Sequence, residues 1–129
     1  MMPENQEKLD TSVILINWEE SDIIFNMYYS LYPPIGLAYI AAMLKKEIKD
    51  VSIIDAPAMG YKEGDVLKII DEKKPDFVGF TVFTPQVESV LKLCEEIKKI
   101  SPNTKTILGG PHVFFEYEEV MKNDNVDFC

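Results

Sequence analysis

The 129-residue sequence predicts an α/β fold in which helices cover both faces of a parallel sheet. Short apolar runs rich in β-branched residues alternate with longer segments of helical periodicity, which is typical of parallel strands joined by crossover helices. The predicted strands are apolar on both faces, as a sheet covered on both sides requires. The length suits one domain, residues 11–129, after a polar tail at residues 1–10.

Each expected strand is a short apolar run next to turn or charged residues. The five runs are residues 12–17, 51–55, 77–81, 106–108 and 126–129, the last being only the beginning of a strand. Residues 56–60, between the second strand and the next helix, are expected to form a loop.

Four helices are expected between these strands. The first covers residues 35–46 and has lysines in its last turn, and the second centres on residues 66–70. The third begins at Thr84-Pro85, where Thr84 can cap the helix and Pro85 suits its first turn. The fourth helix is short and is marked by Tyr117, Val120 and Met121.

Right-handed crossovers between these strands give a doubly wound, flavodoxin-like (Rossmann-like) sheet of five parallel strands in the order 2-1-3-4-5. Ligands of such sheets bind outside the carboxyl ends of the strands, where strands one and three lie side by side. The candidate binding loops are therefore those that follow Asn17, Asp55, Thr81 and Leu108.

Composition excludes several classes of partner. The chain has 13 basic and 22 acidic residues and a formal charge of −9, so it lacks the basic stripe that a nucleic-acid-binding domain normally carries. No signal-peptide core and no membrane-spanning run is present, so we expect a cytoplasmic protein without a membrane partner. The chain stops inside an apolar run at Cys129, which indicates a cut within a larger protein.

Several familiar chemistries lack their residues. Neither G-x-G-x-x-G nor G-x-x-x-x-G-K-[ST] follows the first strand, and Thr81 stands where a phospho-accepting receiver domain needs an aspartate. There is no C-x-x-C, and we expect Cys94 to be a buried thiol. One histidine makes a zinc site built by the protein improbable, and no Ser-His-Asp or Cys-His arrangement is evident. We therefore expect no catalytic residue and no metal ligand in this chain.

The loop after the first strand, residues 18–34, is long and rich in large apolar and aromatic side chains. Loops of this length in compact domains are usually functional or disordered, and this composition argues against disorder. It could present a flat surface to a large planar ligand or a partner domain, or fold back as a satellite core.

Three further segments suit a ligand at the carboxyl edge. Tyr32-Pro33-Pro34-Ile35-Gly36-Leu37 fixes the entry to a helix, and its glycine permits close approach to the helix backbone, although an ordinary proline-started helix explains it too. Thr81-Val82-Phe83-Thr84 places hydroxyls at a strand end. Gly109-Gly110-Pro111-His112 exposes backbone amides after a buried strand, or forms a simple tight turn.

Together these segments resemble the N-terminal cobalamin (B12)-binding domain of B12-binding radical S-adenosylmethionine (SAM) proteins. The matching pieces cover most of the chain from residue 12 onward: residues 33–42, 51–55, 74–81 and 108–112. The resemblance implies that cobalamin lies across the carboxyl edge of the sheet, with its nucleotide tail between sheet and helices. It implies cofactor-binding roles for Tyr32, Pro33, Pro34, Gly36, Leu37, Asp55, Thr81, Phe83, Thr84, Gly109, Gly110, Pro111 and His112.

One departure from related cobalamin proteins is informative. Mutases and methionine synthase carry D-x-H-x-x-G after the first strand, and its histidine binds cobalt from below. Aligning that glycine with Gly36 puts Leu31 at the aspartate and Pro33 at the histidine, and proline cannot ligate cobalt. We therefore expect base-off cobalamin without a histidine ligand; His112 could in principle reach cobalt, or merely shape the glycine turn.

The C-x-x-x-C-x-x-C motif of a radical SAM domain is absent, so the resemblance implies that a 4Fe-4S cluster and SAM belong to a missing part of the parent protein. There, a radical SAM domain in cis would perform methyl transfer, ring formation or another rearrangement.

Two alternatives to cobalamin binding stay open. One is a degenerate docking domain of the same fold that no longer binds cobalamin. The other is a flavin-binding domain, which is weaker because the acidic residues 18–22 would repel a phosphate.

Overall fold

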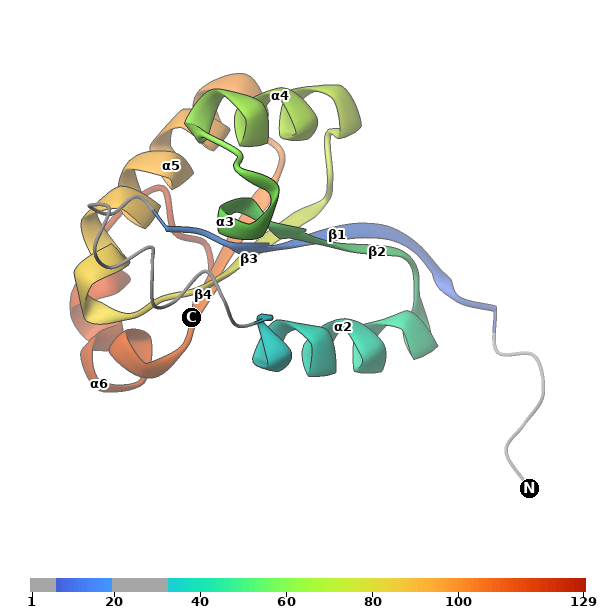
Figure 1. Cartoon of the computed structure of the whole chain (residues 1–129), viewed down its shortest axis with the longest axis horizontal. Coiled ribbons are helices and arrows are strands. Elements are labelled where there is room, and N and C mark those ends of the chain that lie inside the picture. Colours follow the sequence, from blue (N-terminus) through green and yellow to red (C-terminus); the bar gives the residue numbers. More distant parts are fainter. Residues whose placement is uncertain (1–6, 20–32) are drawn as a thin grey trace.

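The computed structural model describes residues 7–19 and 33–129, which form a parallel sheet with helices on both sides (Figure 1). The strands are β1 (Leu9–Asn17), β2 (Ile48–Asp55), β3 (Phe77–Thr81) and β4 (Lys105–Gly109). The helices are α2 (Ile35–Glu47), α3 (Ala56–Met59), α4 (Glu63–Lys73), α5 (Val87–Ile100) and α6 (Pro111–Val120), with a 3-10 turn, η1 (Thr84–Gln86), before α5. The strand order β2-β1-β3-β4, with every pairing parallel, confirms the predicted fold class.

The expected fifth strand is not shown as a strand. Phe128 forms a single parallel bridge with Ile107 of β4, on the side of the sheet edge that the predicted order requires. The pairing rests on a few backbone hydrogen bonds, among them Leu108 N–H to the Phe128 carbonyl at 2.9 Å. A single bridge is too little pairing to form a strand, so the described sheet has four strands.

The two faces of the sheet are covered unequally. Helices α4 and α5 pack on one face, where the larger apolar core lies, and α2 lies on the opposite face (Figure 1). The core under α4 and α5 contains Ile16, Val78, Leu108, Ile70, Leu93 and Ile97. The cluster under α2 is smaller and contains Val13, Leu15, Val51, Leu37 and Ala41.

Three local expectations need correction. Thr84 does not cap a helix with its side chain: it begins the 3-10 turn, and its hydroxyl lies 3.1 Å from His112 Nδ1 instead. Residues 56–59, expected as loop, form α3, because Pro57 suits a first helical turn and Gly60 ends the helix in a left-handed conformation. The last helix begins at Pro111, earlier than its apolar residues indicated, so His112 lies in its first turn.

Cys94 is buried in α5, as expected, on the helix face that also carries Val90 and Ile97. Burial raises the pKa of its thiol to about 12, so this cysteine is a packing residue. Across the described residues, no helix combines the length and the apolar character needed to cross a bilayer.

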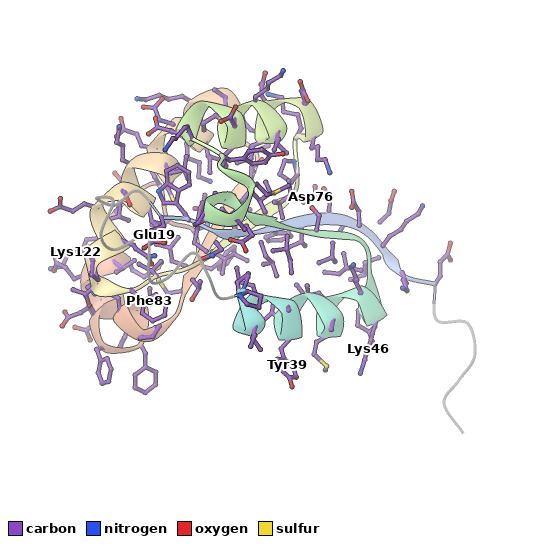
Figure 2. All side chains as sticks on the ribbon, viewed as in Figure 1. Glu19, Tyr39, Lys46, Asp76, Phe83 and Lys122 are labelled. Carbon is purple, nitrogen blue, oxygen red and sulfur yellow. The ribbon has the colours of Figure 1, made fainter. Side chains whose placement is uncertain are left out.

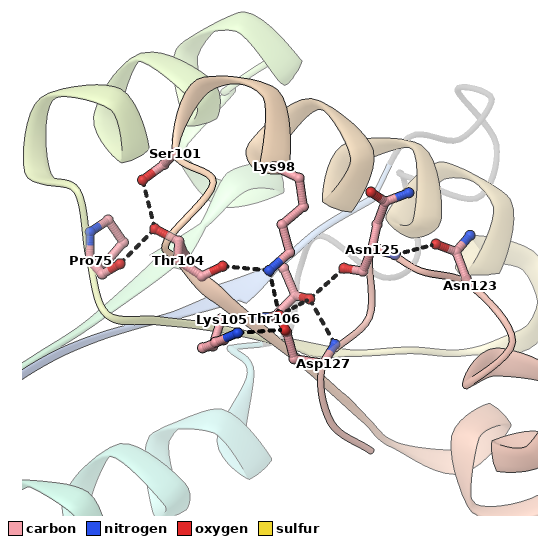
Figure 3. Close-up of polar contacts among 9 residues, drawn as sticks. All are labelled: Pro75, Lys98, Ser101, Thr104, Lys105, Thr106, Asn123, Asn125 and Asp127. Atoms are coloured by element: carbon pink, nitrogen blue, oxygen red, sulfur yellow. Dashed lines mark hydrogen bonds and ion pairs between the residues drawn. The ribbon is translucent and has the colours of Figure 1, made fainter.

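Asp127 fastens the C-terminal segment to the sheet (Figure 3). Its carboxylate accepts hydrogen bonds from the Lys98 ammonium at 2.5 Å, the Thr106 amide at 2.8 Å and the Lys105 ammonium at 3.1 Å. Burial alone would raise the pKa of Asp127, but these hydrogen bonds outweigh it and hold the pKa well below its ordinary value. This network keeps Phe128 beside β4.

We expect Asp127→Asn to lower the free energy of unfolding at pH 7 by about 2 kcal/mol, because charge-assisted hydrogen bonds are lost. The folded-state pKa of Asp127 lies below its unfolded value of about 3.9, so its contribution is complete above that pH and is lost as the pH falls. The difference between wild type and variant should therefore shrink between about pH 5 and pH 2. Urea unfolding across this range measures it, with exposed Asp124→Asn as the control; a difference independent of pH would contradict the assignment.

Gly109, the last residue of β4, and Gly110, the next residue, should differ in what they contribute to stability. Gly110 has φ +100° and ψ −178°, and a Cβ there would lie 2.7 Å from Val82 N. A Cβ at Gly109 would meet only the Phe80 carbonyl oxygen, at 4.0 Å. We expect Gly110→Ala to lower the free energy of unfolding by at least about 2 kcal/mol, and Gly109→Ala to change it by less than about 1 kcal/mol. Urea unfolding of the pair tests this, and equal losses would contradict it.

Candidate cofactor-binding site

A wide cleft opens at the carboxyl ends of the strands. Its volume is about 1260 Å³, larger than the roughly 300–1,000 Å³ of pockets for drug-sized ligands. The N-terminal turn of α2 forms one wall, the ends of β1 and β3 with the η1 turn form the floor, and α6 with the residues after it forms another wall. Glu19, Phe83 and Lys122, which line it, lie together at this end of the molecule in Figure 2.

The cleft brings together most of the residues singled out from the sequence. Nine of them line it: Pro33, Pro34, Gly36, Leu37, Thr81, Phe83, Thr84, Pro111 and His112. Asp55, Gly109 and Gly110 do not line it, and Tyr32 lies outside the described residues. Three segments that are far apart in the sequence thus meet at the edge that the fold class predicted.

Hydrogen bonds join the start of α6 to the end of β3. The His112 amide donates to the Val82 carbonyl at 3.1 Å, and the Val82 amide donates to the Gly109 carbonyl at 2.8 Å. His112 Nδ1 lies 3.1 Å from the Thr84 hydroxyl, within hydrogen-bond distance. These contacts fix the imidazole beside the η1 turn at the wall of the cleft.

Asp55 contributes through a neighbour. Its carboxylate accepts a hydrogen bond of 2.9 Å from the side-chain amide of Asn17, and the two residues pair across β1 and β2. Asn17 lines the cleft. Asp55 therefore orients a polar side chain at the cleft floor.

Carboxylates dominate the charge of the cleft. Glu19, Glu116 and Glu119 line it, and Lys122, which also lines it, pairs with Glu119 at 2.5 Å. Carboxylates accept hydrogen bonds from amide groups but repel phosphates. The cleft therefore suits a ligand that carries amide groups at its periphery.

A second hollow lies on the sheet face beneath α2. It is a groove of about 380 Å³, at the small end of the range for ligand pockets. Its walls are hydrocarbon or glycine throughout: Val13, Leu15, Leu37, Ile40, Leu44, Ile48, Phe77, Gly79, Phe80, Ile107 and Gly109. In this part of the sheet α2 covers β1 and β2, and the groove runs over β3 and β4.

The cleft and the groove adjoin. Leu37 lines both of them. Along β3, Thr81 faces the cleft and Gly79, two residues earlier on the same face, lines the groove. Gly109, the last residue of β4, lines the groove, and Pro111, the first residue of α6, lines the cleft. One elongated ligand could therefore occupy both hollows.

Three glycines make room in these hollows. A Cβ placed on Gly36 would meet no atom within 4 Å, and one on Gly109 would meet a single atom at that limit. Neither has a positive φ, so the protein's own packing and backbone do not require glycine there. Gly79 pairs with Leu15 on one side and Ile107 on the other. A Cβ on Gly79 would lie 2.9 Å from Leu15 Cδ2, so this glycine makes room for the Leu15 side chain in the groove floor.

Sequence reasoning placed a nucleotide tail between the sheet and the helices, but it missed most residues of the groove and several of the cleft. In the sequence Asn17 looks like no more than a strand end, and Gly79 like part of an apolar run. The signal for Gly79 is present, because glycine inside a strand often marks the close approach of a ligand. Ile40 and Leu44 give no such signal, since apolar residues on a helix normally indicate core.

Comparison with known proteins places the chain in a family. The family model of the B12 binding domain matches residues 22–129. The chain is 40% identical over 90 residues to an uncharacterised methyltransferase of Pyrococcus horikoshii, covering 70% of this chain and 19% of that protein. It is 36% identical over 92 residues to the anaerobic magnesium-protoporphyrin IX monomethyl ester cyclase of Rubrivivax gelatinosus, covering 70% and 17%.

It is also 30% identical over 112 residues to the cytidylyl-2-hydroxyethylphosphonate methyltransferase of Streptomyces wedmorensis, covering 73% of this chain and 21% of the relative. The chain thus spans about a fifth of the length of the curated relatives it matches. The family match extends over most of the chain and includes every described residue of α2, β3, β4 and α6 that lines the two hollows. The chain belongs to the B12-binding domain family.

Proposed function

We propose that this chain binds cobalamin with the corrin ring in the cleft and the nucleotide base in the apolar groove. The observation that carries the proposal is the junction of the two hollows at Leu37: one is wide and lined by both polar and apolar residues, and the other is narrow and apolar. Cobalamin has the same two parts, a broad ring with peripheral amides and an aromatic base on a tail. Gly36 and Gly109, which the protein's packing does not require, provide space for the two parts respectively.

We further propose that the bound cofactor is base-off and has no histidine ligand from the protein. A base in the groove lies away from the cleft, so it does not reach cobalt from below. Pro33 stands where related cobalamin proteins have their cobalt-binding histidine, and it lines the cleft, as Gly36 does. His112 is held beside the Thr84 hydroxyl, which supports a role in shaping the wall.

The parent protein, in this proposal, is a cobalamin-dependent radical SAM enzyme that joins this domain to a catalytic domain in cis. The relatives are named as methyltransferases and a cyclase, and the matched segment is about a fifth of each. Cobalamin supplies a methyl carrier or a one-electron carrier, while the chain supplies binding and orientation. The 4Fe-4S cluster and SAM would belong to the other domain.

The docking alternative has one observation in its favour. Phe114 and Phe115 on α6 are 78% and 77% exposed, and their rings pack edge to face at 5.0 Å. Such exposed aromatic pairs mark contact surfaces. Phe115 lines the cleft and Phe114 does not, so a partner bound to this pair would lie at the rim of the cleft.

Titration with hydroxocobalamin tests the proposal, and Trp18 reports on it. Trp18 is the single tryptophan of the chain, it is buried, and its neighbours Asn17 and Glu19 line the cleft. Because corrins absorb at tryptophan emission wavelengths, binding should quench its fluorescence, and the colour should travel with the protein on gel filtration. No quenching and no retained colour would contradict the proposal; retention of flavin mononucleotide instead would favour the flavin alternative.

A matched pair of variants tests the location. Gly36→Leu should weaken hydroxocobalamin binding at least about tenfold, since a leucine side chain would project into the cleft, while helix propensity improves by about 1 kcal/mol. Ala38→Leu, on an exposed position of the same helix outside both hollows, is the control. If both variants bind like wild type, the corrin does not occupy the cleft.

The ligand state of cobalt is tested by electron paramagnetic resonance of the chain loaded with cob(II)alamin. We expect a spectrum without nitrogen splitting, because neither the displaced base nor a histidine is bound to cobalt. His112→Ala should leave that spectrum unchanged. Nitrogen splitting that disappears in His112→Ala would show that His112 is the ligand and would overturn the histidine-free assignment.

A further inference from the structure

Among the residues that the structure describes, those lining the base groove offer hydrocarbon contacts and no side-chain hydrogen bond. Its floor is Gly79 between Leu15 and Ile107, and its α2 wall is Ile40 and Leu44. The amides and carbonyls of β3 are paired in the ladders with β1 and β4, so the floor presents few free backbone groups.

Polar groups lie only beyond the two ends of the groove as the described residues define it. At one end Thr81 opens on the cleft. At the other end Lys105, two residues before Ile107 on the same strand, holds its ammonium 3.1 Å from the Asp127 carboxylate. A heteroatom that a base in the middle of the groove turns toward these walls would therefore be dehydrated without gaining a partner, which is unfavourable.

We infer that this groove selects among cobamides by the polarity of the lower base, and that it favours apolar bases over purines. This inference rests on the proposed function and specifies the ligand class of the same site. A benzimidazole or phenolic base presents mostly carbon to the walls. Adenine carries additional ring nitrogens and an exocyclic amine, each of which needs a hydrogen-bond partner when it is buried.

The polarity of the groove wall can be changed at Ile40 without disturbing the core. Its side chain lines the groove, yet the residue is 50% exposed, so replacement by glutamine should leave the helix folded. Ile40→Gln would bring an amide donor and acceptor to the wall. Met43→Gln is the matched control, because Met43 is 61% exposed on the same helix and lines neither hollow.

The experiment titrates wild type and both variants with hydroxo forms of cresolyl cobamide, adeninyl cobamide and cobinamide, which has no base, and follows Trp18 quenching. In wild type, cresolyl cobamide should bind at least about tenfold more tightly than adeninyl cobamide. Ile40→Gln should narrow that ratio by about threefold to tenfold, and Met43→Gln should leave it unchanged within about twofold. The cost of detaching a base from cobalt belongs to the free cobamide, so it cancels when ratios are compared between proteins.

A second variant, on the floor of the groove, tests the inference independently of Ile40→Gln. In Gly79→Ala the new Cβ would lie 2.9 Å from Leu15 Cδ2 and would displace that side chain within the groove floor, so the variant should bind cresolyl cobamide more weakly relative to cobinamide. A ratio unchanged in Ile40→Gln, or cobinamide binding as tightly as cresolyl cobamide, would overturn the inference and leave cobalamin binding intact. Failure of all three corrinoids to bind wild type would overturn the proposed function itself.

Discussion

A parallel sheet has two apolar faces, and the way this chain covers them sets the positions of both hollows. Right-handed crossovers put α4 and α5 on one face, where Val78 of β3 and Ile97 of α5 are fully buried. On the other face α2 covers β1 and β2, and the surface over β3 and β4 stays open as the groove. The cleft follows from the same geometry, because the carboxyl ends of the strands and the start of α2 meet at one edge.

The two glycines at the end of β4, Gly109 and Gly110, show that one short segment serves both folding and binding. Gly110 serves the fold, since its backbone conformation and its closeness to Val82 exclude a side chain. Gly109 serves no such purpose and opens on the groove. The sequence motif alone does not separate these roles, because both residues suit a turn or a ligand cradle. The roles differ because Val82, the residue after β3, lies beside Gly110. That contact depends on the tertiary structure.

Much of the fold was predictable from local pattern. Apolar, β-branched runs located the strands, and three- and four-residue spacing located α5 with Cys94 on its buried face. The role of Thr84 was not predictable, because its hydroxyl lies beside His112, 28 positions away, in place of the adjacent helix. The α2 wall of the groove was not predictable either, since Ile40 and Leu44 look like core residues until the sheet beneath them is known.

The most direct test of the two-hollow account is an amide proton–nitrogen correlation spectrum of the chain recorded with and without hydroxocobalamin. Gly36 lines the cleft, Gly79 and Gly109 line the groove, and Gly60 and Gly64 line neither. The account predicts that the signals of Gly36, Gly79 and Gly109 shift or broaden on binding, while those of Gly60 and Gly64 stay in place. Shifts confined to Gly36 would place the corrin without its base, and shifts at Gly60 and Gly64 alone would contradict both assignments.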